Sequence, residues 1–261
     1  MEEKNVILSV AIATFNEEQN ISACLTSVVS WVDEIVIVDG GSTDRTVEIA
    51  KSFGAKAIKT DNPPIFHINK QKAVDACSGE WILQLDADEV VSEDLKNEIV
   101  HIMKGLKTNQ KAGYFIPRKN YFLGHWLRKG GQYPDYVIRF FRRGKGFFPS
   151  KSVHEQIEID GDVGYVKNHI LHYSYKTVNE YWKKADAYIS LEARQLQQLQ
   201  TPIHVLSFFN FNFVKPTYTF LNIFVRHKGF MDGWYGLLFA VFSSLHFPIA
   251  YMRYIHLKRS A

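Results

Sequence analysis

Two carboxylates stand two residues apart in residues 81–88 (WILQLDAD), where an apolar run ends. In an extended chain, residues two apart point to the same side, so we expect Asp86 and Asp88 to face together. Carboxylates on one side repel unless a cation or a donor lies between them. Mg²⁺ and Mn²⁺ bind one or two carboxylates together with substrate phosphates. The pair therefore predicts a metal site that assists departure of a diphosphate; the alternative is an acidic turn that caps the next helix.

The elements that must position this pair alternate between strand and helix. Apolar, β-branched runs predict buried strands at residues 6–13, 34–39, 55–59 and 81–86. Helices are expected after Asn16, over residues 46–53 and 70–77, and from Glu93 with Ser92 as its cap. This alternation predicts an α/β fold with a mostly parallel sheet flanked by helices. Ligands bind beyond the carboxyl ends of such strands, so we expect residues 14–16, 39–41 and 86–88 to converge.

Three segments in this order, SVAIATFNEE, EIVIVDGGSTDRT and GEWILQLDADE, resemble glycosyltransferase family 2, whose catalytic domain has the GT-A fold. The resemblance implies that Asp86 meets the ribose or the metal and that Asp88 binds the metal. Lys70 stands near a position where members often carry Arg, and it would contact the diphosphate. Gly40 departs from the second acidic residue of many members, which leaves the base open. The implied nucleotide-sugar site comprises Thr14, Phe15, Asn16, Glu17, Asp39, Lys70, Asp86, Ala87 and Arg139.

Simpler roles stay open for several of these residues. Asn16 could serve simply as the cap of the following helix, and residues 42–44 could cap the second helix. Thr14 and Phe15 could serve only strand-end packing. Lys70 and Lys72 could be solvated surface charges.

A second polar group occupies residues 130–155. Its YPD-x-x-x-R-x-F-R-R stretch and its Val-His-Glu resemble the lipopolysaccharide-core glucosyltransferase branch of the family. An inverting transfer needs a carboxylate that takes the proton of the acceptor hydroxyl. Asp135 and Glu155 are the two candidates, with Asp135 slightly favoured, although it could be only a turn residue. His154 could bind the metal, and Arg139 could neutralise phosphate or belong to a basic surface.

The carboxyl-terminal part of the chain is aromatic and poor in charge. Residues 176–200 read as an amphipathic helix, residues 203–225 contain one charge, and residues 233–252 contain none. Residues 233–252 are long enough to cross a bilayer as a helix. A single crossing there, or a hairpin of both apolar segments, would place basic residues outside, against the positive-inside rule. We therefore expect two helices that lie in the membrane surface; the alternative is packing on the catalytic domain or on a dimer partner. The expected domains are 1–175, catalytic with halves of about 5–110 and 111–175, and 176–261, membrane-associating.

Composition narrows the class of protein. A net charge of +4 gives no argument for nucleic acid, and no G-x-G-x-x-G follows the first strand, which argues against an NAD enzyme. Two cysteines and an acidic start without a signal-peptide pattern favour the cytoplasmic face of the inner membrane. The sequence thus predicts an inverting glycosyltransferase with Mn²⁺ or Mg²⁺, a UDP-sugar as the expected donor, and a lipid-linked or lipopolysaccharide-core acceptor. An inactive membrane scaffold with the same fold is the alternative.

Overall fold

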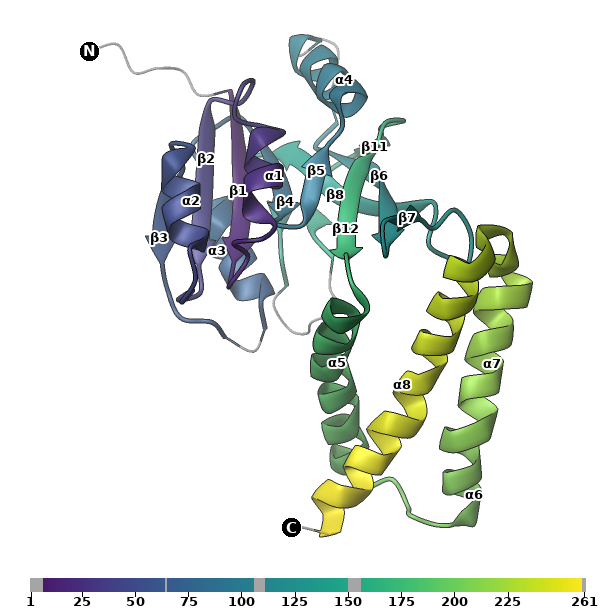
Figure 1. The fold of residues 1–261 in the computed structure, drawn as a ribbon. Coiled ribbons are helices and arrows are strands. Elements are labelled where there is room, and N and C mark those ends of the chain that lie inside the picture. Colours follow the sequence, from purple (N-terminus) through teal and green to yellow (C-terminus); the bar gives the residue numbers. More distant parts are fainter. Residues whose placement is uncertain (1–6, 64, 106–110, 150–155, 260–261) are drawn as a thin grey trace. The chain divides into compact units, whose positions relative to one another are not determined.

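The computed structural model describes residues 7–63, 65–105, 111–149 and 156–259 (Figure 1). The chain forms two compact units. The first unit comprises Met1–Arg118 and Tyr136–His172, and the second comprises Lys119–Asp135 and Tyr173–Ala261. Each unit is described by itself below.

Four parallel strands form the amino-terminal half of the first unit's sheet. They are β1 (Leu8–Thr14), β2 (Glu34–Asp39), β3 (Lys56–Lys59) and β4 (Trp81–Asp86), in the order β3-β2-β1-β4. The register pairs Thr14 with Asp39 and Ala13 with Asp86, so the three polar strand ends meet at one edge. The predicted convergence is confirmed.

Helices cover both faces of these strands, because alternate strand residues are apolar on each face. Val10 and Ile12 pack with α1 (Ile21–Thr26), α2 (Thr46–Ser52) and α4 (Glu93–Lys104). Ala11 and Val36 pack with α3 (His67–Asp75) on the other face. The α/β fold class expected from the sequence is confirmed.

The first loop differs from the expectation. The helix begins at Ile21, so the prediction that Asn16 caps it is wrong. Asn16 has a positive φ of 55°, and its side-chain oxygen accepts a hydrogen bond from the Thr43 backbone N–H at 2.8 Å. Asn and Asp adopt this left-handed backbone more readily than most residues. Asn16 therefore joins the first strand end to the second. Ser92 does cap α4, by accepting from the Leu95 N–H.

The rest of the sheet continues from β4 in the order β4-β8-β6-β12-β5, and β8 pairs with β4 antiparallel. β12 pairs antiparallel with β5, and this pairing aligns His172 with Glu89. β11 and β7 pair with β6, and β9 pairs with β10. The bounds are β5 (Glu89–Val91), β6 (Gly113–Phe122), β7 (His125–Trp126), β8 (Asp135–Arg142), β9 (Gly146–Phe147), β10 (Glu158–Ile159), β11 (Val163–Tyr165) and β12 (Ile170–Tyr175).

Helices make up most of the second unit. α5 (Val178–Gln198) begins after Thr177, whose side chain accepts from the Glu180 N–H. A second helical stretch runs through α6 (Val205–Phe209), η1 (Asn210–Val214), α7 (Lys215–Leu221) and η2 (Asn222–Arg226). Its segments η1 and η2 are π-helical. After η3 (Gly229–Asp232), α8 runs from Gly233 to Arg259 and packs against both α5 and α7. The helices expected in this region are all present.

The turn before β4 yields a stability prediction. A Cβ on Gly79 would lie 2.7 Å from the Ser9 Oγ and 2.8 Å from the Ser9 backbone N, where no side-chain rotation relieves the backbone clash. We expect Gly79→Ala to lower the free energy of unfolding by about 2–3 kcal/mol, as overpacking of a rigid site does. Gly105→Ala is the control, because among the residues that the structure describes its Cβ would approach none closer than 3.6 Å. Thermal unfolding of the two variants measures the difference; equal stability would contradict it.

Candidate functional site

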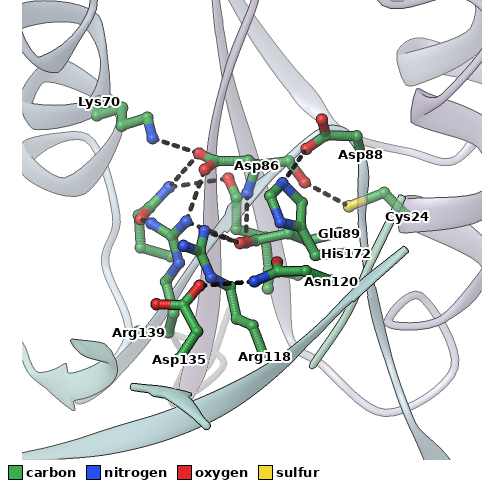
Figure 2. A network of polar contacts seen from close by, with 12 residues as sticks. Cys24, Lys70, Asp86, Asp88, Glu89, Arg118, Asn120, Asp135, Arg139 and His172 are labelled. Atoms are coloured by element: carbon green, nitrogen blue, oxygen red, sulfur yellow. Dashed lines mark hydrogen bonds and ion pairs between the residues drawn. The ribbon is translucent and has the colours of Figure 1, made fainter. Parts of the chain in front are cut away.

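Asp86 lies between two buried cations at the end of β4 (Figure 2). The Lys70 Nζ is 2.5 Å from its Oδ1, and the Arg139 Nη2 is 2.6 Å from its Oδ2. Burial would raise the pKa of Asp86, but the charges of Arg139 and Lys70 outweigh it and hold the pKa well below its usual value. Asp86 is therefore an ionised anchor, and the reading of Lys70 as a solvated surface charge is wrong.

Glu89 completes this ion network from the start of β5. Its side chain is fully buried, accepts from the Arg139 Nη2 at 2.8 Å, and lies 3.3 Å from the Arg118 Nη1. It also accepts from the Asp86 backbone N–H at 2.9 Å. Gln84 accepts a further hydrogen bond from Arg139. The carboxylates raise the pKa of Arg139 against the effect of its burial, so this buried guanidinium stays charged. It does not belong to a basic surface.

Asp88 has a different partner from Asp86. The chain leaves β4 at Asp86 and turns through residues 87 and 88, so the alternation of a strand does not extend to Asp88. Its Oδ1 lies 3.5 Å from the Nε2 of His172, which comes from β12. The expectation that strand spacing alone aligns the two carboxylates is wrong, because the strand ends between them. His172 was not predicted.

A carboxylate and an imidazole form a fitting but partial donor set for a divalent ion. Across residues 7–63, 65–105, 111–149 and 156–259, no three His, Cys, Asp or Glu side chains are grouped for a metal. Two protein ligands leave positions for phosphate oxygens and water. An imidazole ligand suits Mn²⁺ better than Mg²⁺, which prefers oxygen. Cys24 lies nearby, but burial and then the charge of Glu89 raise the pKa of its thiol.

The ends of β1 and β2 form one hydrogen-bonded loop cluster. The buried carboxylate of Asp39 accepts from the Thr14 hydroxyl at 3.1 Å and from the Gly41 and Ser42 backbone N–H groups at 3.0 and 2.8 Å. Ser42 in turn accepts from the Asn16 backbone N–H. The residue before α2 is Arg45, which makes no side-chain cap, so of residues 42–44 only Asp44 reaches the helix start, by accepting from the Thr46 N–H at 3.0 Å. Asp39 thus fixes the shape of this loop.

Gly40 is packed against Asn62 from the loop after β3. A Cβ at position 40 would lie 3.1 Å from the Asn62 Cβ. The side chain of Asn62 therefore fills the space that an acidic residue at position 40 would need.

The remaining nucleotide-site candidates differ in exposure. Phe15 is 43% exposed and stands at the end of β1, open to a ligand. Glu17 accepts from the Asn20 side chain at 2.7 Å. Ala87 is buried in the core, so any contact with a ligand would come from its backbone.

The base candidates are not both described. In the second unit, the Asp135 Oδ2 accepts from the Asn120 Nδ2 at 3.0 Å, and the same Nδ2 reaches the Gln132 carbonyl. Asp135 is the first residue of β8, so it is not only a turn residue. Glu155 and His154 lie outside the described residues.

Glu89, Arg118 and His172 are the site residues that sequence reasoning missed. Glu89 could have been suspected, because an acidic residue directly follows the Asp-x-Asp segment. His172 and Arg118 carry no local signal, since they reach the site only through the pairing of distant strands.

Known proteins resemble this chain over most of its length. The family profile described as "Glycosyl transferase family 2" matches residues 9–157, more than half of the chain. The lipopolysaccharide core biosynthesis glycosyltransferase LpsC of Rhizobium meliloti is 29% identical over 252 residues, covering 89% of this chain and 88% of that one. An uncharacterised glycosyltransferase of Rickettsia typhi is 27% identical over 263 residues, covering 97% and 86%. A crystal structure of Staphylococcus aureus TarS with UDP has a TM-score of 0.49 at 14% identity, covering 86% and 74%.

The family match spans both the segments that carried the resemblance and the YPD stretch, and the resemblance to this family is confirmed. These relatives support an active enzyme and not the alternative of an inactive scaffold. The chain belongs to glycosyl transferase family 2 and is a glycosyltransferase that uses a nucleotide-sugar donor.

Proposed function

We propose that this enzyme is an inverting hexosyltransferase that depends on Mn²⁺ or Mg²⁺ and acts on a lipid-linked or lipopolysaccharide-core acceptor. The acceptor class is supported by the similarity to LpsC over 89% of the chain. The observation that carries the metal proposal is the difference in partners within the Asp-x-Asp segment. Asp86 is neutralised by Lys70 and Arg139, whereas the Asp88 carboxylate lies 3.5 Å from the His172 imidazole.

This difference supports a division of labour. Asp88 and His172 would hold the divalent ion, which when bound offsets the charge that develops on the leaving diphosphate. Lys70 and Arg139 would supply fixed positive charge for the same phosphates. The Nε of Arg139 is buried and has no hydrogen-bond partner among the described residues, so Arg139 is proposed to act on the phosphates through its charge. Asp86 then holds the two cations and contacts the ribose at most through its exposed quarter.

The acceptor proton needs a base, and Asp135 is our candidate. A carboxylate is a sufficient general base for a sugar hydroxyl when it is oriented toward it. The Asn120 side chain that donates to Asp135 fixes the position of this carboxylate within the second unit. Glu155 stays an alternative.

The donor base is proposed to be uridine, and Phe15 is a candidate to stack on it. The exposed ring of Phe15 ends β1, next to the loop cluster that Asp39 shapes. Asn62, which occupies the space beside Gly40, offers an amide where many family members place a carboxylate.

Replacing the metal pair tests the proposed function. We expect Asp88→Asn to reduce Mn²⁺-dependent release of UDP from a UDP-sugar by at least about a hundredfold, because the charged ligand is lost. His172→Gln should raise the Mn²⁺ concentration for half-maximal rate by roughly 10–100-fold. His101→Gln, on the exposed side of α4, is the control. Full turnover by Asp88→Asn would remove the metal role.

Asp86→Asn should act on stability as well as on turnover. It leaves Lys70 and Arg139 with less counter-charge, and we expect a loss of about 2–3 kcal/mol in unfolding free energy at pH 7. Because the pKa of Asp86 is held below its usual value, its contribution is present above about pH 4 and is lost as the pH falls further. The gap between wild type and variant in thermal unfolding should therefore narrow below about pH 4.

Asp88→Asn is the matched control for this measurement. It leaves the pairing of Asp86 with Lys70 and Arg139 intact, so we expect a clearly smaller loss of stability than in Asp86→Asn. An equal loss in both variants would contradict the division of labour.

We further propose that the second unit binds the cytoplasmic membrane surface through the helical stretch from Val205 to Arg226. This stretch exposes a band of large apolar side chains: Val205, Leu206, Phe209, Phe213, Val214, Tyr218, Leu221 and Val225. Exposed Arg226 and Lys228 stand at one end of the unit, and His256, Lys258 and Arg259 at the other. Such a band between basic edges is typical of helices that lie in the membrane surface.

Packing of α5 on α8 favours lying in the surface over crossing. Within the described part of the chain, one helical segment, Gly229–Arg259, is long and apolar enough to span a bilayer. However, Asp186 of α5 pairs with Arg253 of α8 at 2.6 Å, and Tyr181 contacts His246 at 2.9 Å. A crossing α8 would carry α5 with it, including Lys183, Asp186 and Arg194, at a cost of roughly 8–10 kcal/mol. An in-plane orientation leaves the polar side of α5 in water.

Vesicle flotation tests this proposal. The double variant Phe209→Glu with Phe213→Glu places two charges in the exposed band, and we expect it to lose binding to vesicles that contain phosphatidylglycerol. Tyr188→Glu, on an exposed part of α5, is the control and should float like the wild type. Flotation of the double variant at the wild-type level would contradict the assignment of this face.

A further inference from the structure

A hollow lined by tyrosines lies within the second unit, and neither the donor chemistry nor the membrane band uses it. It has a volume of about 160 Å³, and it is lined by Tyr121, Leu123, Gly124, Tyr173, Tyr175 and Lys176. We call this set the tyrosine hollow.

Its walls are fixed by strand pairing. The rings of Tyr121 and Tyr173 stack with centroids 4.8 Å apart and an interplanar angle of 26°. Leu123 and Gly124 form a tight turn between β6 and β7, both with positive φ, and the Leu123 N–H donates to the Tyr175 carbonyl at 2.8 Å. Leucine pays an energetic cost in this backbone region. The hydrogen bond to Tyr175 therefore holds this turn in place, and the turn forms an ordered wall of the hollow.

The volume decides the size of the ligand. Sites for drug-sized molecules occupy roughly 300–1,000 Å³, so a nucleoside diphosphate does not fit here. A cavity of about 150 Å³ holds one six-membered ring. The tyrosine hollow therefore matches a single ring.

The lining decides the chemistry of that ring. Tyrosine offers an apolar face and a hydroxyl, which together suit a ring with C–H faces and hydroxyl groups. Burial and then the neighbouring Tyr121 raise the pKa of Tyr173, so its hydroxyl stays a donor. Lys176 adds positive charge at the lining, and the Lys184 Nζ lies 5.8 Å from the Tyr175 ring. These cations favour a ring with an anionic substituent.

We propose that the tyrosine hollow binds one pyranose ring that carries a carboxylate or phosphate. This sugar binding does not rest on the proposed function, because His172 of the proposed metal pair and Tyr173 of the hollow are consecutive on β12 and their side chains point to opposite faces of the strand.

Binding of simple glycosides to the full-length protein tests the subsite. Methyl β-D-glucopyranoside, its glucuronide and its 6-phosphate are titrated by saturation-transfer NMR, in a detergent that has no sugar headgroup. We expect one or both anionic rings to bind more tightly than the neutral one, and the comparison of the two identifies carboxylate or phosphate.

Four variants locate the binding. Tyr173→Ala should weaken all three rings about tenfold, as loss of a stacking face does. Lys176→Met should weaken only the anionic rings, about threefold to fivefold. Lys176 is exposed, so its replacement leaves the packed core unchanged. Tyr188→Ala and Lys183→Met, both exposed on α5, are the controls and should bind like the wild type.

Several results would overturn the subsite. Wild-type affinities in both Tyr173→Ala and Lys176→Met would do so, and so would displacement of the rings by a fatty acid but not by another sugar. Release of UDP from a UDP-sugar is measured on the same samples. If UDP is released but no glycoside binds, the subsite fails and the proposed function stands. If glycosides bind but no UDP is released with Mn²⁺, the proposed function fails and the sugar site stands.

Discussion

The rest of the site depends on one buried group of charges, in which Asp86 and Glu89 pair with Lys70, Arg139 and Arg118 and leave one positive charge in excess. A charge removed from water is costly unless it is paired and hydrogen-bonded. Here the five groups come from α3, β4, β5, β6 and β8, so each element must be in place before the charges are satisfied. The network thereby fixes the edge of the sheet at which the polar strand ends meet, and it presents fixed positive charge to anionic ligands.

Local patterns were sufficient for the amino-terminal half of the fold. The bounds of β2 and β4 agree with the residues expected, because an unbroken apolar run bounded by polar turns leaves little choice. The first helix was misplaced, because Asn16 has a capping residue's chemistry but a left-handed backbone. The side chain of Asn16 instead accepts a hydrogen bond from Thr43 in the loop before α2. These residues are 27 apart in the sequence, so local sequence rules do not predict the contact.

The sequence predicted only some of the residues of the site. Asp86 and Asp88 were found from their spacing, yet their partners differ because β4 ends at Asp86. Arg139 follows Asp86 by 53 residues and His172 reaches Asp88 through β12, which pairs next to β5 although it is distant from β5 in sequence. Such contacts depend on strand order, and strand order is a property of the whole sheet. Glu155 and His154 lie outside the described residues, so these candidates stay predictions.

The contact between Gly40 and Asn62 has a consequence for how this pocket could change. A Cβ at position 40 would lie 3.1 Å from the Asn62 Cβ and 3.3 Å from the Asn62 Cα, so the loop after β3 must shift by a few tenths of an ångström to admit a side chain there. Shortening Asn62 to alanine would leave the same Cβ and backbone in place. Grafting a relative's base-binding loop with an acidic residue at position 40 therefore requires that the backbone of the loop after β3 be adjusted with it.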